Sequence, residues 1–117
     1  MMKKLAIDRI GIDLVLVSRF KKFASIANHP FLSKAFNKKE IAYCREHKDP
    51  APHFAGIFAA KEAASKALGT NKYPFIELEV RHSTIGVPEI WHKGRKISVR
   101  VSISHTSTTA VAVAVAF

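Results

Sequence analysis

Two acidic residues lie in segments that are otherwise apolar. Asp13 follows Ile10 and Ile12 in a run rich in β-branched residues, and Glu62 lies in a stretch of Phe, Ala and Ile residues. Burying an unpaired carboxylate costs free energy, so each acid needs a cationic neighbour. Mg²⁺ is one candidate, because it takes a few oxygen ligands from a protein and the others from phosphate and water. The two acids are far apart in the sequence, and spacing alone does not prove that they meet.

Lys66 follows Glu62 at the i+4 position, so the two side chains share one face of a helix. One interpretation is an ordinary ion pair on a solvated stripe. The alternative is that Glu62 is a Mg²⁺ ligand and that Lys66 contacts a phosphate or carries a proton one turn away. Asp13 also leaves two interpretations open, a turn or helix-terminal carboxylate and a metal ligand.

His105 lies between Ser104 and Thr106, where the chain is expected to turn. It is either an exposed turn histidine or, with the flanking hydroxyls, part of a phosphate cradle. No serine stands on the glycine-framed elbow of a Ser-His-Asp hydrolase, and no Walker-type or Rossmann-type glycine loop is present. The histidines are scattered and Cys44 is the single cysteine, a pattern that argues against a zinc site and favours a structural cysteine.

The elements that must position these residues begin with a strand over residues 5–17, where apolar residues alternate with Gly11 and Asp13. Asp13 is expected to project from the face opposite to the isoleucines. Ser18 can cap a helix that follows, and the tripeptide 28–30 (NHP) ends it. A second helix begins with the capping-box spacing of Asn37 and Glu40 and runs through residue 45.

The clearest element is a helix over residues 53–68, rich in Ala, Lys, Glu and Leu, with Gly69 as its stop. Its broad apolar side predicts that it is largely buried. The remainder is expected to be β structure: a strand over 75–81, turns at 86–88 and 91–94, and a hairpin with arms 97–104 and 110–117. Residues 1–117 therefore form a single α+β domain in this interpretation.

Composition narrows the class of protein. The chain has 117 residues, 48% of them hydrophobic, and a formal net charge of +10, which fits one globular domain with an anionic partner. That partner can be a nucleic acid, a membrane surface, a phosphorylated small molecule or an acidic protein. No apolar run approaches the roughly 20 residues that span a bilayer, and no signal-peptide core follows the basic N-terminus. With a single cysteine and no internal disulfide, we expect a cytoplasmic protein.

The helix that begins at Ser18 combines cations with aromatic residues. It is either an ordinary amphipathic helix with solvated lysines or a surface that docks an acidic partner helix. The residues concerned are Arg19, Phe20, Lys21, Lys22 and Phe23.

Three segments of the chain resemble the holo-acyl-carrier-protein synthases, the small 4'-phosphopantetheinyl transferases. They are residues 11–15 (GIDLV), 58–70 (FAAKEAASKALGT) and 101–106 (VSISHT), in the same order and at similar spacing. Residues 86–88 (GVP) also resemble the Gly-x-Pro turn of that family. The long helical motif is specific, and the match spans nearly the whole chain. The resemblance implies one transferase domain, an antiparallel sheet packed with a long central helix.

The implied reaction transfers phosphopantetheine from coenzyme A to a serine of acidic apo-acyl carrier protein. It requires Mg²⁺ and releases 3',5'-ADP, and the modified carrier protein serves fatty acid biosynthesis. By motif position, Asp13 and Glu62 resemble the Mg²⁺ ligands, and Lys66 completes the catalytic group. The coenzyme-binding residues implied are Lys61, Lys66, Ser104, His105 and Thr106. The docking helix at Arg19–Phe23 resembles the surface that receives the carrier protein. The family is typically a homotrimer with sites between neighbours, and neither nucleic acid nor membrane is an implied partner.

The reaction suits these residue types. The serine oxygen attacks the β-phosphorus, and Mg²⁺ with Lys66 would stabilise the charge that builds on the pyrophosphate. Glu62, or a water that it orients, would take the serine proton.

The chain departs from the family pattern at two positions. Ile57 stands where the family usually carries Arg, so one phosphate contact is missing and Arg45, Lys48 or Lys61 would have to compensate. The Gly-Thr-Gly loop of the family reads Gly-Thr-Asn at residues 69–71. Two rival interpretations remain: a basic RNA-binding or DNA-binding domain, which leaves the embedded acids unexplained, and a structural trimer without activity.

Overall fold

Five antiparallel strands form one sheet in the order β1-β5-β4-β3-β2. The computed structural model describes residues 6–24, 26 and 29–117. The strands are β1 (Arg9–Leu16), β2 (Leu78–His82), β3 (Pro88–His92), β4 (Arg95–His105) and β5 (Thr109–Ala116). The helices are α1 (Ser18–Ala24), α2 (Pro30–Ala35), α3 (Lys38–Arg45) and α4 (Ala51–Leu68), with a 3₁₀ turn η1 at Phe75–Glu77.

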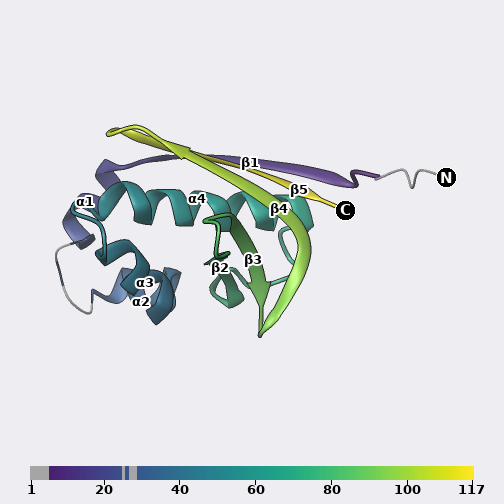
Figure 1. The fold of residues 1–117 in the computed structure, drawn as a ribbon, viewed down its shortest axis with the longest axis horizontal. Coiled ribbons are helices and arrows are strands. Elements are labelled where there is room, and N and C mark those ends of the chain that lie inside the picture. The colour runs from purple at the N-terminus through teal and green to yellow at the C-terminus, as the bar shows by residue number, and fades with distance from the viewer. Residues whose placement is uncertain (1–5, 25, 27–28) are drawn as a thin grey trace.

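The long helix α4 lies along the inner face of β1, β5 and β4 (Figure 1). Strand β4 curves past this helix and carries β3 and β2 down beside it, while α1, α2 and α3 gather at the other end (Figure 1). The predicted α+β fold with a buried central helix is confirmed. No helix among the residues described is both long and apolar enough to cross a membrane.

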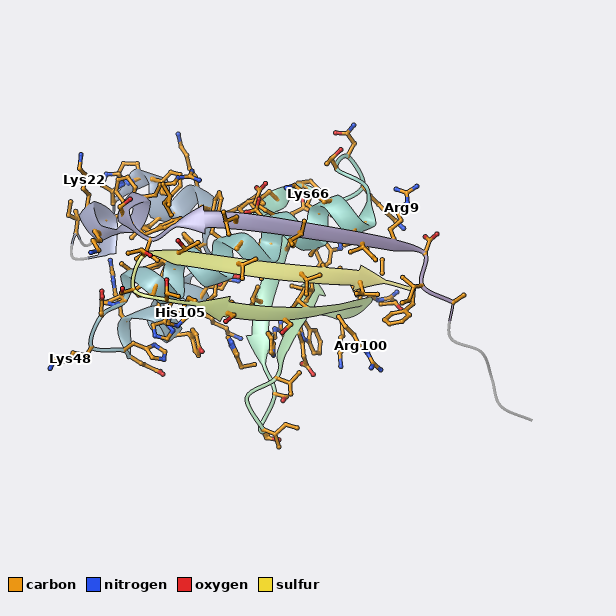
Figure 2. The ribbon with its side chains drawn as sticks, turned by 90° about the horizontal axis from the view of Figure 1, so that it is seen from above. Arg9, Lys22, Lys48, Lys66, Arg100 and His105 are labelled. Carbon is orange, nitrogen blue, oxygen red and sulfur yellow. The ribbon has the colours of Figure 1, made fainter. Side chains whose placement is uncertain are left out.

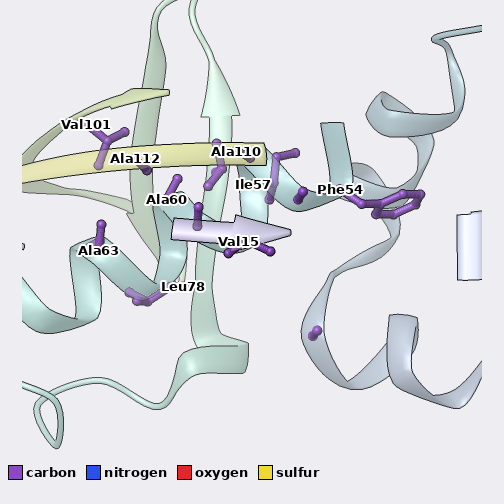
Figure 3. Close-up of a cluster of buried hydrophobic side chains, with 14 of the residues drawn as sticks. Val15, Phe54, Ile57, Ala60, Ala63, Leu78, Val101, Ala110 and Ala112 are labelled. Carbon is purple, nitrogen blue, oxygen red and sulfur yellow. The ribbon is translucent and has the colours of Figure 1, made fainter. Parts of the chain in front are cut away.

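Small residues make the contact between α4 and the sheet. Strand β5 buries its alanines and turns its valines outward, the reverse of what residue size alone would favour. The facing side of α4 is also alanine, and Figure 3 shows Ala60 and Ala63 opposite Ala110, Ala112 and Val15. Small side chains on both surfaces let the two backbones approach closely, which fixes the position of α4 against β1 and β5.

An aromatic cluster closes the core at the end where α1, α2 and α3 meet α4. Phe20, Phe36 and Phe54 are fully buried, with ring centroids 5.9 Å apart for Phe20–Phe36 and 5.1 Å for Phe36–Phe54. The capping box predicted for Asn37 and Glu40 is present at the start of α3. These contacts attach the short helices to the central one.

Several boundaries differ from the sequence-based expectation for local reasons. Pro30 was predicted to end the preceding segment, and it also starts α2. The Phe31 amide donates a hydrogen bond to His29 Nδ1 at 3.1 Å at the start of this helix. Asn28, which belongs to the predicted break, lies outside the described residues. Helix α4 begins two residues early, at Ala51. Residues 75–77 are a 3₁₀ turn rather than a strand, because the Glu77 amide donates to the carbonyl of Pro74 at 3.0 Å. The turn after β3 is confined to Lys93 and Gly94, both at positive φ.

The apolar residues of β1 face away from the core. Ile10, Ile12, Leu14 and Leu16 are between 57% and 68% exposed, whereas Gly11 and Val15 face α4 and are buried. Asp13 projects from the face opposite to the isoleucines, as expected. The alternation of apolar residues thus predicted the strand correctly, but the face of β1 that carries the large apolar side chains points away from α4.

Gly11 is where β1 and α4 come closest. A Cβ at this position would collide with the carbonyl oxygen of Ala63 and lie 2.9 Å from the amide nitrogen of Ala67. Both are backbone atoms of a helix, so neither can rotate away. We expect Gly11→Ala to lower the free energy of unfolding by about 3 kcal/mol, the upper range for overpacking, measured by urea denaturation.

Gly56→Ala is the matched control. Its Cβ would meet only the Cγ2 of Ile103, at 3.0 Å, and that methyl group can shift. The helix propensity gained, about 1 kcal/mol, offsets the contact, so this variant should stay within about 1 kcal/mol of the parent. A Gly11→Ala protein with the parent's unfolding midpoint would contradict the close approach.

Candidate functional site

Asp13 lies on β1 with its side chain toward α4, where Lys66 reaches it. The Lys66 Nζ donates to Asp13 Oδ1 at 3.2 Å and to the carbonyl oxygen of Ile12 at 2.9 Å. The ion pair seen for Lys66 therefore crosses from α4 to β1, instead of running along the helix to Glu62. Lys66 stays half exposed beside the edge strand (Figure 2).

Glu62 lies one helical turn before Lys66, within electrostatic reach of Asp13. Burial raises the pKa of Glu62 above its ordinary value, and the Asp13 carboxylate raises it further. The charges of Lys66 and Arg19 oppose this shift. The structure thus brings together the two acids and the lysine that the sequence singled out, and we call Asp13, Glu62 and Lys66 the acid–lysine site.

The acid–lysine site fits a hard divalent cation. Burial is the main cause of the raised pKa of Glu62, and repulsion by the Asp13 carboxylate adds to it. A bound cation would relieve that repulsion. Among the residues described, no group of three or more His, Cys, Asp or Glu side chains is arranged to hold a metal. A pair of carboxylates with an open side matches Mg²⁺, which keeps waters and takes substrate phosphate oxygens.

His105 lies elsewhere, at the β4–β5 turn (Figure 2). It borders a cavity of about 470 Å³ that also contacts His53 and Ile57 of α4. His53 and Glu62 are nine residues apart in α4, which at about 100° per residue places them on opposite faces of the helix. One chain therefore does not bring His105 to the acid–lysine site.

The neighbours of His105 differ in what their hydroxyls do. Ser104 is exposed, whereas the Thr106 Oγ1 accepts hydrogen bonds from the amides of Thr108 and Thr109 at 3.2 and 3.1 Å. Thr106 therefore builds the turn that presents His105.

Lys61 is fully buried and has partners inside the protein. Its Nζ donates to the carbonyl oxygen of Ala35 at 2.7 Å and to Glu40 Oε1 at 3.0 Å. Burial lowers the pKa of Lys61, and the Glu40 carboxylate opposes that shift. The prediction that Lys61 binds coenzyme is wrong for this position, because the ammonium does not reach the surface.

The docking helix α1 also differs from expectation. Phe20 is 0% exposed and belongs to the aromatic cluster, so the prediction that it anchors a partner is wrong. Phe23 is half-buried against His29 and Phe31, with ring centroids 4.4 and 5.0 Å away. The cations Arg19, Lys21 and Lys22 are exposed as predicted, and Arg19 is near enough to Glu62 to lower its pKa.

Sequence reasoning missed two groups of residues. Glu40 was recognised only as a capping residue, although it is also the buried partner of Lys61. A group of histidines with Tyr43 surrounds the cavity beside His105. The histidines at 47 and 53 on either side of the proline-containing turn 49–52 were a signal for part of this group.

Comparison with known proteins places this chain and its fold in one family. The model of the 4'-phosphopantetheinyl transferase superfamily matches residues 9–116. A holo-[acyl-carrier-protein] synthase of Thermodesulfovibrio yellowstonii is 40% identical over 107 residues, which cover 91% of this chain and 95% of that protein.

Solved structures agree with the sequence relatives. The holo-(acyl-carrier-protein) synthase of Bacillus anthracis, in complex with coenzyme A (3',5'-ADP), superposes with a TM-score of 0.77 at 34% identity, covering 93% of this chain and 95% of that one. The Helicobacter pylori holo-[acyl-carrier-protein] synthase in complex with coenzyme A gives a TM-score of 0.74 at 31% identity, with 90% and 96% covered. The chain therefore belongs to the 4'-phosphopantetheinyl transferase superfamily, a family of transferases.

Proposed function

We propose that the protein transfers 4'-phosphopantetheine from coenzyme A to a serine of apo-acyl carrier protein, in a Mg²⁺-dependent reaction that releases 3',5'-ADP and supplies fatty acid biosynthesis. Relatives that cover nearly the whole chain are named for this activity. The observation that carries the proposal is the acid–lysine site, where Lys66 binds Asp13 and Glu62 stands beside them.

Each side chain of the acid–lysine site has a role in this proposal. Asp13 and Glu62 would hold Mg²⁺, which when bound neutralises charge on the pyrophosphate. Lys66 is half exposed, so its ammonium can turn from Asp13 to a phosphate oxygen of the substrate. Glu62, directly or through a water that it orients, would take the proton of the attacking serine.

The test is an incubation with coenzyme A, Mg²⁺ and apo-acyl carrier protein, followed by intact-mass measurement. We expect the carrier protein to gain the mass of one phosphopantetheine arm, and the gain to disappear in excess chelator. No gain with any carrier protein tested would overturn the proposal.

We also propose the homotrimer with sites between subunits. The outer face of β1 carries the exposed side chains of Ile10, Ile12, Leu14 and Leu16, a contiguous apolar stripe of the kind that marks protein interfaces. A neighbouring copy on this face would cover the stripe. It could also bring its own His105 toward the acid–lysine site, which the chain's own His105 does not approach. Sedimentation of Leu14→Lys against the parent chain tests this arrangement.

Docking of the acidic carrier protein on α1 would be electrostatic, since Phe20 is buried. We expect the double variant Lys21→Glu, Lys22→Glu to raise KM for the carrier protein at least about tenfold at low salt, with a smaller difference at high salt. KM for coenzyme A should not change. Arg19 is left intact because its charge reaches Glu62.

The double variant Lys38→Glu, Lys39→Glu is the charge-matched control. These two lysines are also consecutive and exposed, at the start of α3. If both double variants raise KM equally, attraction by net charge explains the effect and α1 is not the docking surface.

A further inference from the structure

Lys61 and Glu62 are consecutive residues of α4 that point to different sides of the helix. Glu62 belongs to the acid–lysine site. The Lys61 Nζ is buried among the short helices, where it donates to the carbonyl oxygen of Ala35 at the end of α2 and to Glu40 Oε1 in the first turn of α3. Neighbours on a helix point about 100° apart. One turn of α4 therefore carries the proposed chemistry on one side and holds the short helices on the other.

The Glu40 carboxylate extends this contact to the sheet. Its Oε1 also accepts a hydrogen bond from the Asn37 amide at 2.9 Å, and its Oε2 accepts one from the Val80 amide of β2 at 2.8 Å. Among the described residues, every buried side-chain nitrogen or oxygen atom has a hydrogen-bond partner. Replacing a buried ion pair by apolar residues is often neutral for stability, whereas its hydrogen bonds require fixed directions. The Lys61–Glu40 pair therefore fixes where α2, α3, α4 and β2 meet.

The same lysine is linked to the docking helix through two aromatic rings. The Lys61 Nζ lies 5.7 Å from the ring centroid of Phe36, the residue that caps the end of α2. The Phe36 ring packs edge-on against Phe20 of α1, with centroids 5.9 Å apart and planes at 73°. Phe20 is the buried residue of α1 between the exposed Arg19 and Lys21. Two contacts thus lead from the turn of α4 that carries Glu62 to the docking helix.

We propose that the Lys61–Glu40 ion pair positions the docking helix relative to the acid–lysine site. It acts through Phe36 and Phe20, and neither charged residue touches a substrate. The inference rests on the proposed function, in which the carrier protein docks on α1 and its serine reaches the acid–lysine site. Because the carrier protein must satisfy both contacts at once, a shift of α1 along α4 moves the serine out of line. A misplacement of about 1 Å can cost about a hundredfold in rate.

Phe36→Leu tests this route without removing a charge. Leucine keeps an apolar side chain in the cluster but withdraws the ring from Lys61 and Phe20. We expect kcat/KM for the carrier protein, per folded enzyme, to fall at least about fivefold, while KM for coenzyme A stays unchanged. The double variant Lys61→Met, Glu40→Gln should behave in the same way, because no donor then reaches the carbonyl oxygen of Ala35.

Val99→Ala is the matched control for lost packing. Val99 is buried, as Phe36 is, but it pairs with Ala116 at one end of the β4–β5 ladder. The turn at the other end lies beside α1, where the Val17 amide donates to the carbonyl oxygen of Thr108 at 2.9 Å. The urea midpoint of Val99→Ala should fall, whereas its kcat/KM for the carrier protein should stay within about twofold of the parent chain.

A double-mutant cycle shows whether the effect runs through the docking helix. In the Lys21→Glu, Lys22→Glu background the carrier protein no longer seats on α1, so adding Phe36→Leu should lower kcat/KM by less than about twofold more. A loss that multiplies in full with the charge reversal overturns the positioning role. An equal rise in KM for coenzyme A, or a parent-like kcat/KM for the carrier protein, also overturns it. The two routes of disruption remove different side chains, so if one variant fails to fold the other decides.

The parent chain separates the positioning role from the proposed function. If it transfers phosphopantetheine and the variants keep its kcat/KM, the proposed function stands and the positioning role is lost. If the parent chain modifies no carrier protein, the proposed function is overturned and the positioning role falls with it.

Discussion

Glu62→Gln is expected to abolish phosphopantetheine transfer, with a loss of about three orders of magnitude in kcat/KM. The amide keeps the size of the side chain but removes one of the two carboxylates that would hold Mg²⁺. The remaining acid, Asp13, already accepts a hydrogen bond from Lys66 at 3.2 Å. A single carboxylate that is already paired with Lys66 would hold the ion much more weakly than two carboxylates. The readout is the rate of mass gain of the carrier protein over a range of Mg²⁺ concentrations.

The control for this variant is Glu89→Gln. Glu89 is a carboxylate of β3 that pairs with Lys96 at 3.1 Å on the surface, and such pairs contribute little to stability. It should retain the activity of the parent chain. Full activity of Glu62→Gln, or activity of the parent chain in excess chelator, would contradict the assigned metal role.

Lys61→Met should destabilise the fold strongly while leaving KM for coenzyme A unchanged. Glu40 accepts hydrogen bonds from Lys61 and Asn37 on Oε1 and from the Val80 amide at 2.8 Å on Oε2. Without the ammonium this carboxylate stays buried and uncompensated, at a cost of about 3–5 kcal/mol. Urea denaturation measures the loss, and kinetics on the folded fraction measures KM.

A double-mutant cycle gives the control. Adding Glu40→Gln to Lys61→Met removes the uncompensated charge but keeps an oxygen acceptor, so the double variant should recover part of the stability that the single variant loses. If the Lys61→Met protein is as stable as the parent chain and has a raised KM for coenzyme A, the result would support the original prediction that Lys61 contacts the coenzyme.

The sequence predicted the elements that rest on local patterns. The alanine-rich helix, its glycine stop and the C-terminal hairpin depend on propensity, caps and alternation, all of which are local. The acid–lysine site could also be predicted from the sequence, because two acids in apolar segments require a cation wherever they lie.

Predictions failed where the answer depends on which side of an element meets the core. Phe20 stands among cations in the sequence, yet α1 turns this one side chain into the aromatic cluster. Lys61 is adjacent to Glu62 in the motif, but neighbours on a helix point about 100° apart, so one reaches the interior and the other the site. The cavity beside His105 was invisible because several elements, distant along the chain, assemble it.

The pairing of β1 with β5 has a consequence for how the protein folds. Residues 9–16 and 109–116 form one ladder, although nearly the whole described chain lies between them. The inner face of α4 is covered by both strands, so during synthesis that alanine-lined face stays open until the segment of β5 has left the ribosome. Contacts of such long sequence separation close late and slowly. The acid–lysine site requires β1 to be packed on α4. It therefore forms only after β5 has been translated, although no residue of β5 belongs to the site.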